Sequence, residues 1–204
     1  MSDTWIESYT GKHVDILNFK EEDVDIVDIA TALSNNCRYN GHCPFYSVAE
    51  HSIILVRLFD SGLLKGVINF DENKKLKFQR WALMHDAAEA YLSDIPMPYK
   101  TEEVIGKRYL ELEDEILNVI ISRFGLKGTI PTVVNIVDKS FALHEAHYLK
   151  KSMGKDWDSK FDFLFYPEKY KLKMYSPTEA RDEFLKHFDD LFFYREYYTE
   201  GRSL

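Results

Sequence analysis

The most constraining feature of this 204-residue chain is the segment from Trp81 to Leu92, which reads W-A-L-M-H-D-A-A-E-A-Y-L. Its residues favour a buried helix, yet His85 and Asp86 stand side by side within the apolar run. An imidazole and a carboxylate are costly to desolvate without partners, and a divalent metal ion pairs with both. On a helix, Glu89 shares their face. The segment therefore predicts metal ligands and a proton-transfer group on one helix.

Helical spacing recurs along the rest of the chain, whereas no set of alternating strands is evident. The fold class predicted is all-α, a compact bundle of roughly six or seven helices. The segment 155–175 is aromatic and lysine-rich without a clear period, and we expect a loop with a short helix there. Helices are expected at 24–34, 47–58, 77–92, 102–124, 132–150 and 176–194, and short strands at 5–9 and 13–18.

Helix ends are marked by local signals. Ser47–Glu50 and Ser176–Glu179 both have the spacing of a capping box, and the second has Pro177 at the first helical position. Glu102 and Glu103 suit the positive end of the helix that they begin. Gly125 suits the position just after that helix ends. Two prolines in S-D-I-P-M-P end the helix that carries the His-Asp doublet.

The charge balance excludes some classes of partner. The chain has 34 acidic and 26 basic residues and a net charge of −8, so it lacks the basic surface of a general nucleic-acid binder. No apolar stretch reaches the ~20 residues that span a bilayer, and no signal peptide is evident. Cys37 and Cys43 flank His42 but lack a fourth ligand, so free thiols in a reducing compartment are expected. We expect a cytoplasmic protein without a nucleic-acid or membrane partner.

Two further residues extend the candidate metal site. His51 lies near the start of one predicted helix, and Asp138 lies on another among apolar neighbours. Each alone has an ordinary explanation, as a histidine bonded to solvent or backbone and as a satisfied polar aspartate. Together with the doublet they offer imidazole and carboxylate ligands from three helices, few enough to leave room for water or substrate.

The order His51, His85–Asp86, Asp138 resembles the ligand pattern H…HD…D of the HD-domain metal-dependent phosphohydrolases. The surrounding words strengthen the resemblance: R-Y-N-G-H, F-Y-S-V-A-E-H-S, A-L-M-H-D-A-A-E-A-Y-L-S-D-I-P-M-P-Y-K and V-D-K-S-F-A-L-H-E-A. They resemble YfbR-type 5′-deoxynucleotidases and the related phage dATP triphosphohydrolases called DatZ. The resemblance covers roughly residues 3–150 and implies one HD-type domain over 1–204, with 151–204 as a C-terminal helical extension packing on it.

The resemblance implies a role for each matching residue. Glu89 would be the acid/base residue, and Asp94 would support the reacting water or the geometry of the site. Mn²⁺, Co²⁺, Zn²⁺ or Fe²⁺ would suit the ligands, with Mg²⁺ on the substrate phosphates. The four metal ligands implied are His51, His85, Asp86 and Asp138.

The same resemblance assigns residues to the substrate. Arg38 and Lys100 would contact its phosphate, although either is otherwise an ordinary solvated cation. Tyr39, Phe45 and Trp5 are candidates to stack on the nucleobase, the alternative being that they pack in the core.

The activity implied is hydrolysis of deoxynucleoside 5′-phosphates. The irregular N-terminus, the R-Y-N-G-H loop and the modest spacing from Asp86 to Asp138 favour a dNTP triphosphohydrolase, of the dATP type, that releases the deoxynucleoside. The alternative within the class is a 5′-deoxynucleotidase acting on dNMPs. Of other classes, an inactive HD module that binds a nucleotide remains open, and a purely structural helical protein leaves the doublet unexplained. The resemblance also implies a homo-oligomer in the bacterial cytoplasm or a phage-infected host cell.

Three polar residues near Asp138 complete the candidates. Glu145 lies seven residues further along the same helix and therefore shares the face of Asp138, as a buried partner of the site would. His144 and His147 are more typical of core or surface positions. The aromatic C-terminal run H-F-D-D-L-F-F-Y-R-E-Y-Y is compatible with a subunit interface or with a core-packing helix.

Overall fold

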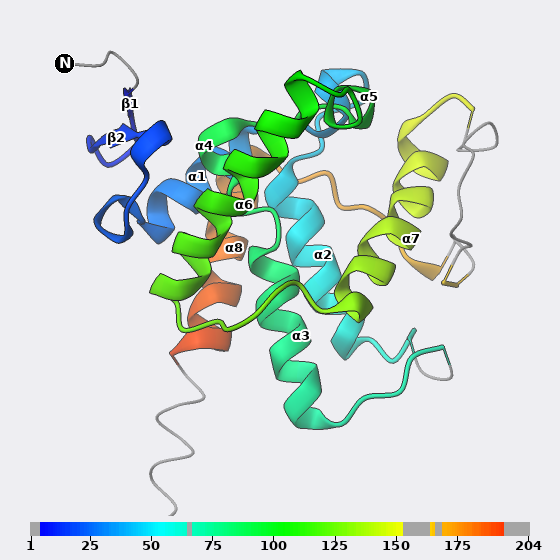
Figure 1. The fold of residues 1–204 in the computed structure, drawn as a ribbon. Coiled ribbons are helices and arrows are strands. Elements are labelled where there is room, and N and C mark those ends of the chain that lie inside the picture. Colours follow the sequence, from blue (N-terminus) through cyan, green and yellow to red (C-terminus); the bar gives the residue numbers. More distant parts are fainter. Residues whose placement is uncertain (1–4, 65–66, 153–163, 166–168, 194–204) are drawn as a thin grey trace, which may run out of the picture.

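The computed structural model describes residues 5–64, 67–152, 164–165 and 169–193. These residues form an all-α bundle with one small hairpin, as the sequence predicts (Figure 1). The hairpin pairs β1 (Trp5–Glu7) with β2 (His13–Asp15) in antiparallel register. The helices are α1 (Ile26–Asn35), α2 (Val48–Asp60), α3 (Glu72–Met84), α4 (Glu89–Leu92), α5 (Met97–Lys100), α6 (Ile105–Arg123), α7 (Thr132–Leu149) and α8 (Pro177–Phe192). Short 3₁₀ turns cover Ile16–Asn18, Glu21–Asp23 and Arg38–Gly41.

Helix α2 is the centre of the bundle. It contacts α1, α3, α7 and α8, and nearly all of its side chains are buried (Figure 1). A helix that is buried on every side belongs in the core of a protein, and any polar residue on it needs a partner inside. His51 and Glu50 are fully buried polar residues on this helix, so their partners define what the core is built to hold.

The C-terminal region packs on this core through α8, which contacts α1, α2 and α3. Its capping box is complete: Ser176 accepts from the amide of Glu179, whose carboxylate accepts from the amide of Ser176. Helix α8 ends at Phe192, and the predicted end near Tyr194 lies outside the described residues. Most of the predicted loop 155–175 also lies outside them.

The capping box predicted at Ser47 is only half correct. Ser47 does accept a hydrogen bond from the amide of Glu50. The Glu50 carboxylate, however, accepts from the amides of Lys173, Met174 and Tyr175. A buried carboxylate satisfied by three backbone donors fastens this distant segment to α2.

The continuous helix predicted over 77–92 is wrong at its start and in its middle, although its end at Leu92 is correct. It begins earlier, at Glu72, because Asp71 caps it through the amide of Lys74. It is also interrupted: after Met84 the amide of Ala87 bonds to the Met84 carbonyl, three residues back, and the chain turns before α4. His85 and Asp86 therefore lie in a turn between two helices and not in the middle of one.

The next helices differ from prediction in smaller ways. Helix α6 starts at Ile105 and not at 102, because the Glu102 carboxylate accepts from the amides of Val104 and Ile105 and so caps the first turn from outside. Gly125, with φ of 70°, takes the expected position after the helix. Helix α4 does end at Leu92, but it ends before the prolines, where Ser93 has φ of 64°. Pro98 lies in the first turn of the short α5, which the sequence did not predict.

Candidate metal centre

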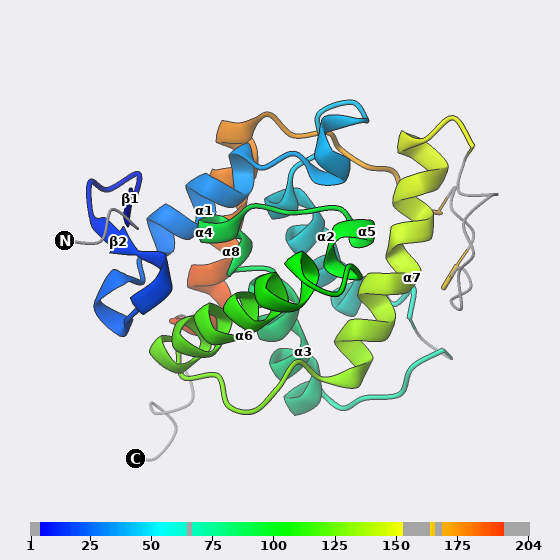
Figure 2. The same cartoon turned by 45° about the horizontal axis from the view of Figure 1, so that its top comes forward.

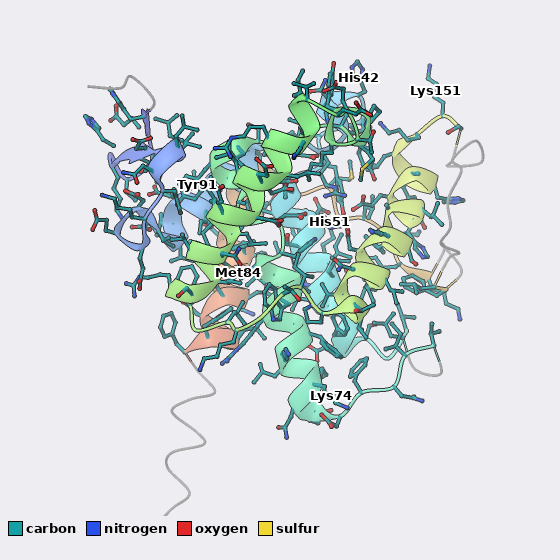
Figure 3. The ribbon with its side chains drawn as sticks, in the orientation of Figure 1. His42, His51, Lys74, Met84, Tyr91 and Lys151 are labelled. Carbon is teal, nitrogen blue, oxygen red and sulfur yellow. The ribbon has the colours of Figure 1, made fainter. Side chains whose placement is uncertain are left out.

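Three buried or half-buried side chains from three parts of the fold meet at one point. His51 comes from α2, His85 follows the last residue of α3, and Asp138 comes from α7. Figure 3 shows His51 in the interior of the bundle. One ligand atom from each of the three residues lies within 4.8 Å of the others, so the group can hold a metal ion.

Hydrogen bonding fixes which nitrogen of each histidine faces this point. His51 Nδ1 contacts the Glu145 carboxylate, and His85 Nδ1 lies 2.9 Å from the carbonyl oxygen of Ala82. A carbonyl or an ionised carboxylate only accepts, so each Nδ1 carries the hydrogen and each neutral ring keeps its lone pair on Nε2. Among the described residues neither buried Nε2 has a hydrogen-bond partner. Two imidazoles held in this way are arranged as metal ligands.

The carboxylates approach the two free nitrogens closely. Asp138 Oδ1 lies 3.1 Å from His51 Nε2 and 3.9 Å from His85 Nε2. Asp86 Oδ2 lies 3.2 Å from His85 Nε2 and 3.9 Å from His51 Nε2. Atoms that each sit about 2.1 Å from one ion must lie within about 4.2 Å of each other, and all four separations satisfy this. The donor set therefore fits a divalent metal, although Asp86 is not part of the group of three.

A single buried carboxylate organises the surroundings of His51. Besides His51, Glu145 accepts hydrogen bonds from the hydroxyls of Tyr39 and Tyr46 and from Arg38. Although burial opposes its charge, Arg38 and His51 lower the pKa of Glu145 to about 2. The prediction of Glu145 as a buried partner of the site is confirmed by these contacts. Tyr46, which the sequence analysis did not identify, joins the same group.

In the metal-free protein the ligands perturb one another. Burial and Arg38 disfavour a charged His51, but Glu145 and Asp138 outweigh them and raise the pKa of His51 to about 9. Burial also opposes ionisation of Asp138, yet His51, His85 and Arg38 hold its pKa well below its usual range. The site thus favours negative carboxylates facing a positive centre, which a metal cation supplies as well as a proton does.

Next to the ligands lies a group of alternating charges. Lys100 Nζ donates to Glu89 Oε1 at 3.1 Å and to Glu113 Oε1 at 2.9 Å. Burial, then Asp86 and Asp94, raise the pKa of Glu89 well above its usual range. Burial likewise raises the pKa of Asp94. The structure thus brings Glu89, Asp94 and Lys100 together as expected, and adds Glu113, which no sequence motif indicated.

The loop predicted to meet substrate has an unusual backbone. Tyr39, Asn40 and Gly41 have φ of 58°, 54° and 71°, so three successive residues are left-handed. Such a run is strained at Tyr39, and strained backbone is common at binding sites. Arg38 Nη1 lies 3.6 Å from Asp86 Oδ2, so the loop reaches the candidate metal centre directly. Tyr39 is held by Glu145 through its hydroxyl.

Other candidate residues lie elsewhere or take other roles. Trp5 stacks on His13 in the hairpin, whereas Phe45 is 38% exposed. Cys37 and Cys43 are free thiols, as expected. His144 is a core residue, stacked with Phe141 and Phe165.

Comparisons with known proteins place the chain among relatives. No family model matches it. It is 34% identical over 137 residues to the protein RCAP_rcc00048 of Rhodobacter capsulatus, covering 66% of this chain and 65% of that protein. It is 31% identical over 189 residues to the protein YfdR of Escherichia coli K12, covering 92% of this chain and 96% of that protein. Both relatives are named as uncharacterized proteins. None of the described helices is long and apolar enough to cross a membrane. With nearly its whole length aligned, the chain belongs to the family of YfdR.

Proposed function

We propose that this protein is a metal-dependent hydrolase of deoxynucleoside 5′-phosphates. The observation that carries the proposal is the pair of buried Nε2 atoms of His51 and His85, which have no hydrogen-bond partner in the described part of the chain and face Asp138 within 4.8 Å. Free imidazole nitrogens beside carboxylates, next to a buried acid and two cations, are what metal-assisted hydrolysis of a phosphate ester needs. Resemblance of the sequence words to HD-domain phosphohydrolases supplies the substrate class.

The residues suit divided roles. A divalent ion such as Mn²⁺, Co²⁺, Zn²⁺ or Fe²⁺ would supply Lewis acidity and an activated water. Glu89 is the proposed acid/base group, because burial raises its pKa above its usual range and so makes its carboxylate a stronger proton acceptor. Arg38 and Lys100 are proposed to bind phosphate, and Asp94 to hold the geometry between them. Asp86, 3.2 Å from His85 Nε2, is the proposed fourth ligand.

We favour a dNTP, of the dATP type, as substrate, with release of the deoxynucleoside. Hydrolysis of dNMPs is the second candidate, and one observation favours it. Arg38 pairs with Asp86 and Glu145, and Lys100 pairs with Glu89 and Glu113. Each cation is already balanced by carboxylates, which suits the smaller charge of a monophosphate better than that of a triphosphate.

The test is turnover of each of the four dNMPs and four dNTPs with Mn²⁺ or Co²⁺, with products resolved by chromatography. Asp138→Asn should lose activity by several orders of magnitude, because it removes a carboxylate that faces both histidines. Asp189→Asn, an exposed carboxylate on α8, is the matched control and should keep it.

The reaction products distinguish the two candidate substrates. Release of deoxynucleoside from dNTPs supports the favoured substrate, and release from dNMPs alone supports the second. Nucleotide binding without turnover would contradict the enzyme and favour a nucleotide-binding HD module. Chelation of the metal should abolish turnover and its return should restore it.

A further inference from the structure

One face of α6 holds the segment that links α4 to α6. Gly106, Tyr109 and Glu113 are spaced three and four residues apart and so lie on one side of the helix. In Figure 2 the first turn of α6 lies beside α5, and the two helices are in contact. We propose that Glu113 is a positioning residue, which holds the Lys100 ammonium where a substrate phosphate is bound. This inference rests on the proposed function.

Gly106 fixes the backbone of Lys100. A side chain at position 106 would place its Cβ 2.5 Å from the carbonyl oxygen of Tyr99 and closer still to that of Lys100. The end of α5 therefore packs directly on the backbone of α6, in a space that only glycine leaves open. With its backbone fixed there, Lys100 can vary only in where its side chain points.

Glu113 determines that direction. Lys100 Nζ lies between Glu89 on α4 and Glu113 on α6, and its side chain is only 16% exposed. An ammonium paired with Glu89 alone would be drawn toward α4, whereas the second carboxylate, on α6, holds it between the two helices. Lysine has three N–H donors, and these two carboxylates use two. No other acceptor in the described ranges takes the third, which leaves it for a phosphate oxygen.

Tyr109 secures the other end of the same segment. Its hydroxyl donates to the carbonyl of Ser93, and its ring lies 5.3 Å from Lys100 Nζ. Ser93 has φ of 64° and ψ of 155°, a conformation that costs a non-glycine residue energy and therefore needs support. Ser93 precedes Asp94, so the α6 face positions both Asp94 and Lys100.

A double-mutant cycle tests whether Glu113 acts through Lys100. The variants are Glu113→Leu, Glu113→Gln, Lys100→Met and Lys100→Met/Glu113→Leu, all with Mn²⁺ bound. The readouts are the Kd of inorganic phosphate, KM and kcat for the substrate, metal content and thermal unfolding. Glu113→Leu should raise the phosphate Kd and KM by about tenfold or more, because a displaced phosphate-binding group binds poorly. Metal content should not change.

The effect of Glu113→Leu in the Lys100→Met protein decides whether Glu113 acts through Lys100. In Lys100→Met protein, adding Glu113→Leu should have no further effect on phosphate affinity. Glu113→Gln, which keeps a hydrogen-bond acceptor, should fall between wild type and Glu113→Leu and serves if the leucine variant does not fold. Equal losses in both backgrounds, or an unchanged phosphate Kd in Glu113→Leu, would overturn the positioning role.

The same experiment separates this inference from the proposed function. A wild-type protein that hydrolyses deoxynucleotides while Glu113→Leu keeps its phosphate affinity contradicts the positioning role alone. A wild-type protein that neither binds phosphate nor hydrolyses any of the nucleotides contradicts the proposed function, and the positioning role with it.

Discussion

His144 shows at the scale of one residue how burial shapes the response to pH. Burial among Phe141 and Phe165, against the opposing charge of Glu145, lowers the pKa of His144 to about 4. In the unfolded chain this histidine binds its proton near pH 6.5. Between about pH 4 and 6.5 the unfolded state therefore carries more protons than the folded state, so lowering the pH favours unfolding. The contribution to stability is therefore complete above pH 6.5 and declines as the pH falls.

His144→Phe should remove this decline, because phenylalanine fits an aromatic stack and does not titrate. The measurement is the free energy of unfolding of both proteins in urea from pH 4.5 to 8. Relative to wild type, the variant should gain stability as the pH falls below 6.5. A difference between the two proteins that is the same at every pH would contradict the prediction.

Single residues also show where sequence reasoning succeeds. His51, His85 and Asp138 could be found because only a few residue types bind divalent metals, and their setting among apolar residues made them unusual. Glu113 could not be found, because an acidic residue on a mixed helix face is ordinary in sequence. Its significance depends on the approach of α5, which is a contact between elements and not a property of the pattern.

At the scale of elements, the least predictable feature is the break between α3 and α4. Alanine, leucine and methionine surround the His-Asp doublet, and all favour a continuous helix. The chain nevertheless turns at Ala87, and the turn brings Asp86 toward His51 of α2 and His85 toward Asp138 of α7. Tertiary contacts outweighed local preference here. The bounds of α7, in contrast, were predicted nearly to the residue, as 132–150 against Thr132–Leu149 in the structure.

The contact between α5 and α6 gives a second prediction at this scale. Gly106→Ala should cost about 1–3 kcal/mol of unfolding free energy, because the new methyl group meets backbone that cannot rotate away. Lys107→Ala, at an exposed position in the same turn, should stay within about 0.5 kcal/mol of wild type. Urea unfolding measures the stability of both variants. Equal stabilities would contradict the prediction, because they would show that α5 moves away from the new methyl group at little cost.

At the scale of the whole molecule, a bound metal would join parts of the chain that are far apart in sequence. His51, His85 and Asp138 belong to α2, to the turn after α3 and to α7. Because the unfolded chain does not hold these groups together, metal should stabilise the folded state by about 2.7 kcal/mol at a concentration of 100 Kd. Thermal unfolding of metal-free protein titrated with Mn²⁺ or Zn²⁺ measures the rise in Tm. His85→Gln should show little rise, and a wild-type Tm that does not change with either metal would contradict a shared site.

The Glu145 carboxylate limits how this site can change over evolutionary time. Arg38 and Tyr39 of the loop and His51 of the core all bond to it. A loop and a candidate metal ligand that depend on one acceptor cannot be altered separately. A descendant of this protein that acquires a new substrate by changing Arg38 or Tyr39 also inherits a changed hold on His51, so selection acts on the two together.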